Sequence, residues 1–133
     1  MKKSKKKKIA GIIIGLCISL LIIFTVISVY MKISHAKKEG VAFAQNKTTQ
    51  DCLNEVTYGN HVCLDTSCFL NNRYFYQSCM DSAEESAELC DSLPTIRVLL
   101  KLEIWKKKQC DNLGRKDRGC HHIWLKALEV CGK

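Results

Sequence analysis

The longest apolar stretch of the chain runs from Ile9 to Tyr30 and contains no charged residue. As an α-helix rising about 1.5 Å per residue, these 22 residues extend roughly 33 Å, which is enough to cross a bilayer core of about 30 Å. A helix that is apolar on all sides needs to be buried, and the residues that follow are too few to enclose it. The pattern therefore predicts one N-terminal transmembrane helix.

The clearest periodic pattern lies near the C-terminus and predicts an amphipathic helix. Its apolar positions follow the spacing i, i+3, i+4, i+7, i+8 and i+11, which places them on one helix face. Gly119 precedes this helix and Gly132 follows it. The residues expected on the buried face are Cys120, Ile123, Trp124, Ala127, Leu128 and Cys131.

Two further helices are expected between the membrane segment and residue 81. The first begins near Thr48 or Thr49 and ends at Gly59, because Gly59-Asn60 interrupts the pattern. The second begins at Asp65 or Thr66, both of which are good N-cap residues.

The middle of the exported part contains two more helix signals. Ser82-Ala83-Glu84-Glu85 matches a capping box and predicts a helix over Ala83 to Asp91. Pro94 suits the first turn of a longer helix that Gly114 ends. Alternate residues from Ile96 to Ile104 are also apolar, as in a strand, but no other clear strand exists to pair with them. We therefore expect a helix whose apolar stripe is Val98, Leu99, Leu102 and Trp105.

These elements predict an all-α protein, in which a single N-terminal transmembrane helix precedes a small disulfide-stapled helical bundle or hairpin. The expected divisions are a basic cytoplasmic tail over 1–8, a signal-anchor over 9–30, a linker over 31–47 and an exported cysteine-rich domain over 48–133.

Nine cysteines in 133 residues define the chemistry of the exported part. One of them, Cys17, lies within the apolar segment and is expected to be a small packing residue. The remaining eight form an even set in a small exported domain, which is typical of a disulfide framework. Zinc knuckles and thioredoxin-like sites need Cys-x-x-Cys, which is absent. The expected disulfide residues are Cys52, Cys63, Cys68, Cys79, Cys90, Cys110, Cys120 and Cys131.

The sequence leaves the pairing of these cysteines open among 105 arrangements. Cysteines 11 residues apart on one helix lie about 16 Å apart, which is too far for a bond. If each disulfide joins two helix ends across the loop between them, the favoured pairs are Cys52–Cys63, Cys79–Cys90 and Cys110–Cys120. The two remaining cysteines would then form Cys68–Cys131. The stretch from Cys110 to Cys120 resembles the disulfide-bridged loops of Sel1-like cysteine-rich repeat proteins, and we infer no function from this resemblance.

The distribution of charge predicts the orientation and excludes a nucleic-acid ligand. Residues 1–44 carry nine Lys and one Glu, whereas residues 45–133 carry twelve basic and twelve acidic residues. Six of these Lys precede the apolar segment, so the positive-inside rule keeps the N-terminus in the cytoplasm. The neutral exported part lacks the uncompensated charge that nucleic-acid binding needs. Within it, residues 45–91 carry net charge −6 and residues 92–133 carry +6.

Catalytic signatures are absent from the sequence. It contains no nucleophile elbow, phosphate-binding glycine loop or HExxH motif. The acidic residues Glu84, Glu85 and Glu88 lack a visible acid–base partner. The adjacent pair His121-His122 points to different faces of a helix, so we expect no metal, cofactor or catalytic residue.

We therefore predict a bacterial inner-membrane protein with a single span and a periplasmic domain that serves as a binding or accessory module. Its expected partners are the membrane and another protein. The alternative to another protein is a second copy of this chain, which would pack against the small-residue stripe Gly11, Gly15 and Ser19. The sequence is also compatible with a secreted effector or inhibitor, released by cleavage after Ala36 or Ala44. A eukaryotic type II membrane protein fits the same pattern, as does a protein of the mitochondrial intermembrane space, although only Cys110 and Cys120 match the Cys-x9-Cys spacing usual there.

Overall fold

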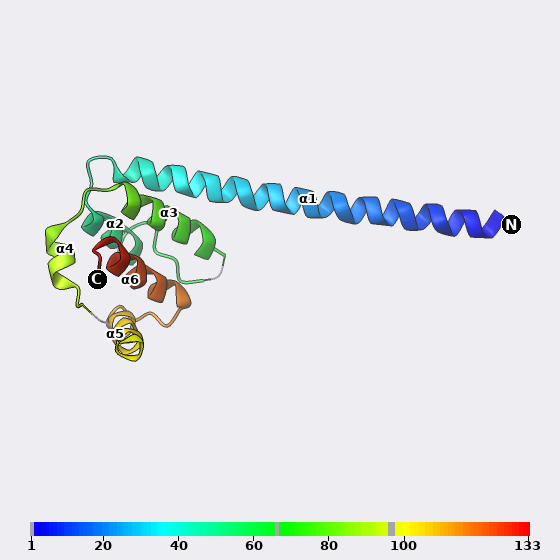
Figure 1. Cartoon of the computed structure of the whole chain (residues 1–133). Coiled ribbons are helices and arrows are strands. Elements are labelled where there is room, and N and C mark those ends of the chain that lie inside the picture. The colour runs from blue at the N-terminus through cyan, green and yellow to red at the C-terminus, as the bar shows by residue number, and fades with distance from the viewer. Residues whose placement is uncertain (1, 66, 96–97) are drawn as a thin grey trace. The chain divides into compact units, whose positions relative to one another are not determined.

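The computed structural model describes residues 2–65, 67–95 and 98–133, with side chains from Ile12 onward (Figure 1). These residues form helices and no β-strand, which confirms the all-α prediction. Short turns and loops connect the helices. Their bounds are α1 Lys2–Ala44, α2 Thr49–Thr57, α3 Phe69–Ser82, α4 Ala87–Ser92, α5 Leu99–Asn112 and α6 Arg118–Val130.

The chain divides into two compact units, Met1–Lys32 and Ile33–Lys133. The first unit contains the apolar part of α1, which is long and apolar enough to cross a membrane. Its described side chains from Ile12 to Ile27 are exposed, as expected for a segment that has lipid rather than protein as its surroundings. The second unit contains all four disulfides of the described chain.

The expected linker over 31–47 needs correction, because α1 continues through Ala44 and its last turns belong to the second unit. Three small residues at a spacing of four, Ala36, Gly40 and Ala44, are buried there. A Cβ atom at Gly40 would overlap the carbonyl oxygen of Phe75 in α3. The small stripe therefore lets the last turns of α1 lie against α3 at backbone distance, and the polar composition of 31–47 concealed this packing.

The core of the second unit lies among α2, α3, α4 and α6. Phe75 is at its centre, with 1% of its surface exposed. The ring of Phe75 stacks on His61 at 3.8 Å between centroids and meets Phe43 of α1 edge-on at 5.6 Å. The other large core side chains are Leu53, Val56, Tyr76, Met80, Leu89, Leu93, Ile123 and Leu128.

Helix α2 starts where the sequence predicted. Thr48 is its N-cap and forms a capping box with Asp51, whose carboxylate accepts the backbone N–H of Thr48 at 2.8 Å. Helix α3 begins later than expected, at Phe69. Asp65 instead turns the chain before the helix, because its carboxylate accepts the backbone N–H of Ser67 at 2.7 Å. Thr66, the other expected N-cap, lies outside the described residues.

The capping box expected at Ser82 is wrong. Ser82 ends α3, and Ser86 is the N-cap of the short helix α4. Glu84 is extended and pairs with the segment before α2, since its carbonyl accepts the N–H of Thr49 at 2.8 Å. This tertiary pairing overrides the local signal for an earlier helix start.

Helix α5 forms as expected, but it starts at Leu99 rather than at Pro94. Gly114 ends it with a φ of 66°, a conformation that favours glycine. The expected apolar stripe is only half correct, because Leu102 and Trp105 pack against the core while Val98 and Leu99 are exposed. The alternating apolar residues that would also suit a strand start at Ile96. Residues 96–97 lie outside the described chain, so the structure describes this pattern only from Val98 onward.

Helix α6 confirms the strongest periodic pattern. Asp117 is its N-cap and accepts the N–H of Cys120 at 2.9 Å. Trp124 is half-buried at the margin of the buried face, where its ring meets Trp105 edge-on at 5.6 Å. The fully buried positions of this face are Cys120, Ile123, Ala127 and Leu128.

Candidate binding cleft

The eight cysteines of the second unit form four disulfides. Cys110–Cys120 agrees with the pairing expected from the sequence. The other three expected pairs, Cys52–Cys63, Cys79–Cys90 and Cys68–Cys131, are wrong. The observed bonds are Cys52–Cys79, Cys63–Cys68 and Cys90–Cys131.

The observed pairing follows from where the cysteines lie on their helices. Cys52 and Cys79 face each other across α2 and α3, with a Cα–Cα distance of 5.9 Å, and both are fully buried. Cys90 joins α4 to Cys131 at the end of α6. These disulfides therefore cross-link neighbouring helices through the core, whereas the spacing along the chain favours bridges across successive loops.

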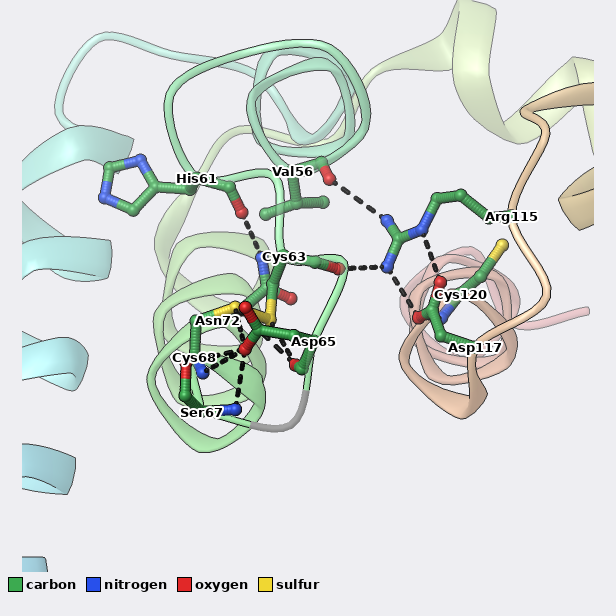
Figure 2. The surroundings of a disulfide bond; sticks show 10 residues. All are labelled: Val56, His61, Cys63, Asp65, Ser67, Cys68, Asn72, Arg115, Asp117 and Cys120. Atoms are coloured by element: carbon green, nitrogen blue, oxygen red, sulfur yellow. Dashed lines mark hydrogen bonds and ion pairs between the residues drawn. A yellow bond between two sulfur atoms is a disulfide. The ribbon is translucent and has the colours of Figure 1, made fainter.

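Arg115, in the loop between α5 and α6, is the central charged residue of the site, and its side chain is only 4% exposed. It donates hydrogen bonds to the carbonyl oxygens of Val56 at 3.4 Å and Cys63 at 2.8 Å. It also pairs with Asp117, as Figure 2 shows. One guanidinium thus joins the end of α2, the loop of the Cys63–Cys68 disulfide and the start of α6.

Asp117 is held as a carboxylate by this arrangement. The hydrogen bond from Arg115 lowers the pKa of Asp117, and the backbone N–H of Cys120 lowers it further. Gly119 permits the close packing beside it, because a Cβ there would lie 2.8 Å from the Asp117 carboxylate and 3.4 Å from the Phe69 ring.

A hollow of about 450 Å³ opens beside this charged cluster. Its apolar surface comes from Leu64, which is 70% exposed, and from Phe69 at the start of α3. Lys116 and Arg118 are exposed at its rim. Its lining also includes the carboxylates of Asp65 and Asp117, which accept hydrogen bonds from Ser67 and Arg115. The hollow therefore combines an apolar surface with two basic side chains that form no ion pair among the described residues.

A second hollow of about 210 Å³ lies between α3 and α6 and shares Phe69, Asn72 and Gly119 with the first. The Nε atom of Arg73 is buried there and has no hydrogen-bond partner among the described residues. His122 is exposed, but its ring lies beside Phe69, and the partial loss of solvent there, followed by the nearby Arg73, lowers the pKa of its imidazole. We call the two hollows together the Phe69 cleft, formed mainly by Leu64, Phe69, Asn72, Arg73, Arg118, Gly119 and His122.

The acidic residues considered from the sequence do not form a catalytic group. Glu84 and Glu85 precede α4 rather than lying on a helix, and both they and Glu88 are exposed. His121 lies 3.8 Å from Glu103 of α5, whereas the ring of His122 lies beside Phe69 of α3.

One group of described residues has the spacing of metal ligands. Potential ligand atoms of Cys63, Asp65 and Cys68 lie within 4.8 Å of one another. Because both sulfurs are joined in a disulfide, neither is a thiolate ligand.

The opposite charges of the two halves of the second unit meet at Lys126. Its ammonium group lies 2.7 Å from Asp81 of the acidic half and 3.1 Å from Glu129. Burial favours the neutral amine, but the hydrogen bonds that the ammonium group donates to these carboxylates outweigh it and raise the pKa of Lys126.

Sequence reasoning missed the roles of Arg115, Phe69 and Gly40. A signal existed for Gly40, which lies four residues from both Ala36 and Ala44. The burial of Arg115 has no local signature, because its carbonyl partners come from a segment more than 50 residues earlier.

The comparisons with known proteins find no matching family model, no matching curated protein and no matching solved structure.

Proposed function

We propose that this chain is a single-span membrane protein whose exported domain binds an acidic, apolar segment of a partner protein in the Phe69 cleft. The apolar helix and the disulfide-rich helical domain fit a membrane-anchored or secreted cysteine-rich protein. The observation that carries the binding role is the juxtaposition of exposed apolar surface with unpaired basic groups in one cleft.

The chemistry of the cleft favours an acidic partner. Leu64 and Phe69 provide contact for an apolar side chain. Arg118 makes no ion pair among the described residues, and the buried Nε of Arg73 lacks an acceptor. A partner segment that presents a carboxylate beside an apolar side chain would supply an acceptor for the arginines and an apolar contact for Leu64 and Phe69.

A binding role is favoured over catalysis because the carboxylates of Asp65 and Asp117 beside the cleft already have structural partners. Asp117 is paired with Arg115 and caps α6. Asp65 accepts hydrogen bonds from the loop that precedes α3. Neither carboxylate is positioned as a free acid or base.

Retention of the membrane helix is favoured over release by cleavage. Ala36 and Ala44 are the small residues at which a signal peptidase would cut, and both are buried in helix α1. Cleavage at Ala44 would also remove Phe43, whose ring packs on Phe75 in the core. The six Lys that precede the span favour export of the domain, into the periplasm if the protein is bacterial.

Site-specific photo-cross-linking in cells that make the full chain tests the binding role. A benzophenone amino acid replaces Leu64 at the cleft, and the matched control carries it at exposed Glu85. We expect an adduct of one discrete mass from position 64 alone. The yield should fall at least several-fold with Arg118→Glu and stay unchanged with Lys47→Glu. Equal adducts from both positions, or an adduct insensitive to Arg118→Glu, would contradict the proposal.

A further inference from the structure

The first half of α5 presents apolar side chains that no described residue covers. Leu100 and Ile104 are four residues apart, so they lie on the same helix face. The exposed fractions are 51% for Val98, 81% for Leu99, 70% for Leu100 and 61% for Ile104. We call these four residues the α5 patch.

Two unpaired basic side chains lie on the same helix as the α5 patch. Lys101 and Lys108 are exposed and form no ion pair among the described residues. The acidic residues of the helix are compensated, since Glu103 lies 2.6 Å from Lys106 and Asp111 lies 2.6 Å from Lys107. The face therefore combines apolar side chains with uncompensated positive charge.

We infer that the α5 patch lies on an anionic phospholipid surface, with its apolar side chains in the headgroup region and its lysines among the phosphates. Lysine side chains suit this position because their alkyl stems remain in apolar surroundings while the ammonium groups reach the charged headgroups. This inference rests on the proposed membrane anchorage but not on the Phe69 cleft.

The covalent structure of the chain supports a lipid partner. The apolar segment ends at Tyr30 and the second unit begins at Ile33. If the apolar segment spans the bilayer, the second unit therefore starts within three residues of the membrane boundary. A small apolar patch is then enough to bind lipid. Because the span already attaches the chain to the bilayer, the contact between the α5 patch and lipid is an intramolecular event.

A second copy of the chain fits this patch less well. Stable protein interfaces bury about 800 Å² on each partner, and four aliphatic side chains fall well short of that area. Two copies joined through the patch would also bring Lys101 and Lys108 of each chain toward those of the other. Like charges at such an interface oppose association.

Photo-labelling from lipid tests the inference with the full chain in nanodiscs. The bilayer contains phosphatidylcholine and phosphatidylglycerol, with a small fraction of a diazirine-bearing phosphatidylcholine as the probe. Mass spectrometry maps the adducts. We expect adducts within 12–30, which report insertion of the span, and adducts within 98–104 at least about tenfold above those at exposed Tyr58 and Leu70.

Two sets of variants separate the apolar and electrostatic contributions. Leu100→Gln with Ile104→Gln should abolish labelling of 98–104, whereas the control Leu70→Gln should leave it unchanged. Lys101→Glu and Lys108→Glu should each lower it about fivefold in the anionic bilayer, as expected for a lysine near such a surface.

The outcomes distinguish failure of this inference from failure of the anchorage. If residues 12–30 are labelled and residues 98–104 are not, the lipid contact of the α5 patch is wrong, and the membrane anchorage by the apolar segment still stands. Two chains per nanodisc, reduced to one by Leu100→Gln with Ile104→Gln in native mass spectrometry, overturn it in favour of a second copy. Absence of labelling in 12–30 contradicts the membrane anchorage and the inference together.

Discussion

Arg115 and Asp117 form a doubly hydrogen-bonded ion pair. The Nε of Arg115 donates to Oδ1 of Asp117 at 2.8 Å, and Nη2 donates to Oδ2 at 2.7 Å. The same carboxylate caps α6, and the same guanidinium holds two carbonyl oxygens from distant segments. Figure 2 shows that this pair connects the disulfide loop to the start of α6.

Replacing Arg115 by Met should strongly destabilise the domain, because it leaves two buried carbonyl groups and one carboxylate without their donor. Breaking a buried pair in this way costs about 3–5 kcal/mol. Arg115→Lys should not restore stability, since lysine lacks the planar fork of donors. Denaturant unfolding of the oxidised full chain in detergent measures the loss.

The matched control for this experiment is Arg118→Met, three residues along the same segment but exposed. It should change the free energy of unfolding by no more than about 0.5 kcal/mol. If Arg115→Met and Arg118→Met unfold at the same denaturant concentration, the central role of Arg115 is wrong.

The lowered pKa of Asp117 predicts a specific acid sensitivity. The unfolded chain takes up this proton near pH 3.9, whereas the folded chain takes it up at lower pH. The stabilisation is therefore fully present above about pH 5 and is lost as pH falls through the folded-state pKa. Asp117→Asn should be less stable at neutral pH and should lose less stability on acidification. Thermal unfolding between about pH 7 and pH 2 checks this, and parallel curves for the two proteins would contradict it.

Gly40 should be intolerant of any side chain if the end of α1 belongs to the domain. A Cβ atom there meets the backbone of α3, which cannot move aside as a flexible side chain can. We expect Gly40→Ala to cost about 1–3 kcal/mol, as other overpacking substitutions do. The control Gly15→Ala has open space around its Cβ and should be neutral. A neutral effect of both changes on thermal unfolding would support a linker at this point.

The four disulfides should contribute unequally to stability. In the loop-entropy description, a longer closed loop gives a larger contribution, about 4 kcal/mol for the 41-residue separation of Cys90–Cys131 and about 2 kcal/mol for the five-residue separation of Cys63–Cys68. Paired Cys→Ala variants measure these values by denaturant unfolding. Peptide mapping without reduction should find the four observed bonds and one free thiol, Cys17. Equal losses of unfolding free energy for the two variants would disprove this order. A disulfide-linked peptide that contains Cys52 and Cys63 would disprove this pairing.

The sequence predicted the elements whose signals are local. The spacing from Cys120 to Leu128 identified α6, and Thr48 marked the start of α2. The apolar run identified the membrane-competent part of α1. In each case the pattern along the chain and the packing of the folded protein agree.

Features that depend on distant contacts could not be predicted in this way. Glu84 pairs with the segment before α2, so the capping box at Ser82 is not used. The bond between Cys52 and Cys79 depends on how α2 crosses α3. The Phe69 cleft likewise exists only because α3 and the start of α6 meet around Gly119.

We propose that a membrane span holds this disulfide-bonded domain on the exported side of the membrane. Labelling of lysines by a membrane-impermeant amine reagent in sealed, right-side-out membrane vesicles tests it most directly, with mass spectrometry of the chain as the readout. We expect labelling of domain lysines such as Lys47, Lys116 and Lys133, and labelling of the tail lysines Lys2 to Lys8 only after detergent opens the vesicles. Labelling of the tail in sealed vesicles, or recovery of a membrane-free chain that lacks the apolar segment, would contradict the account.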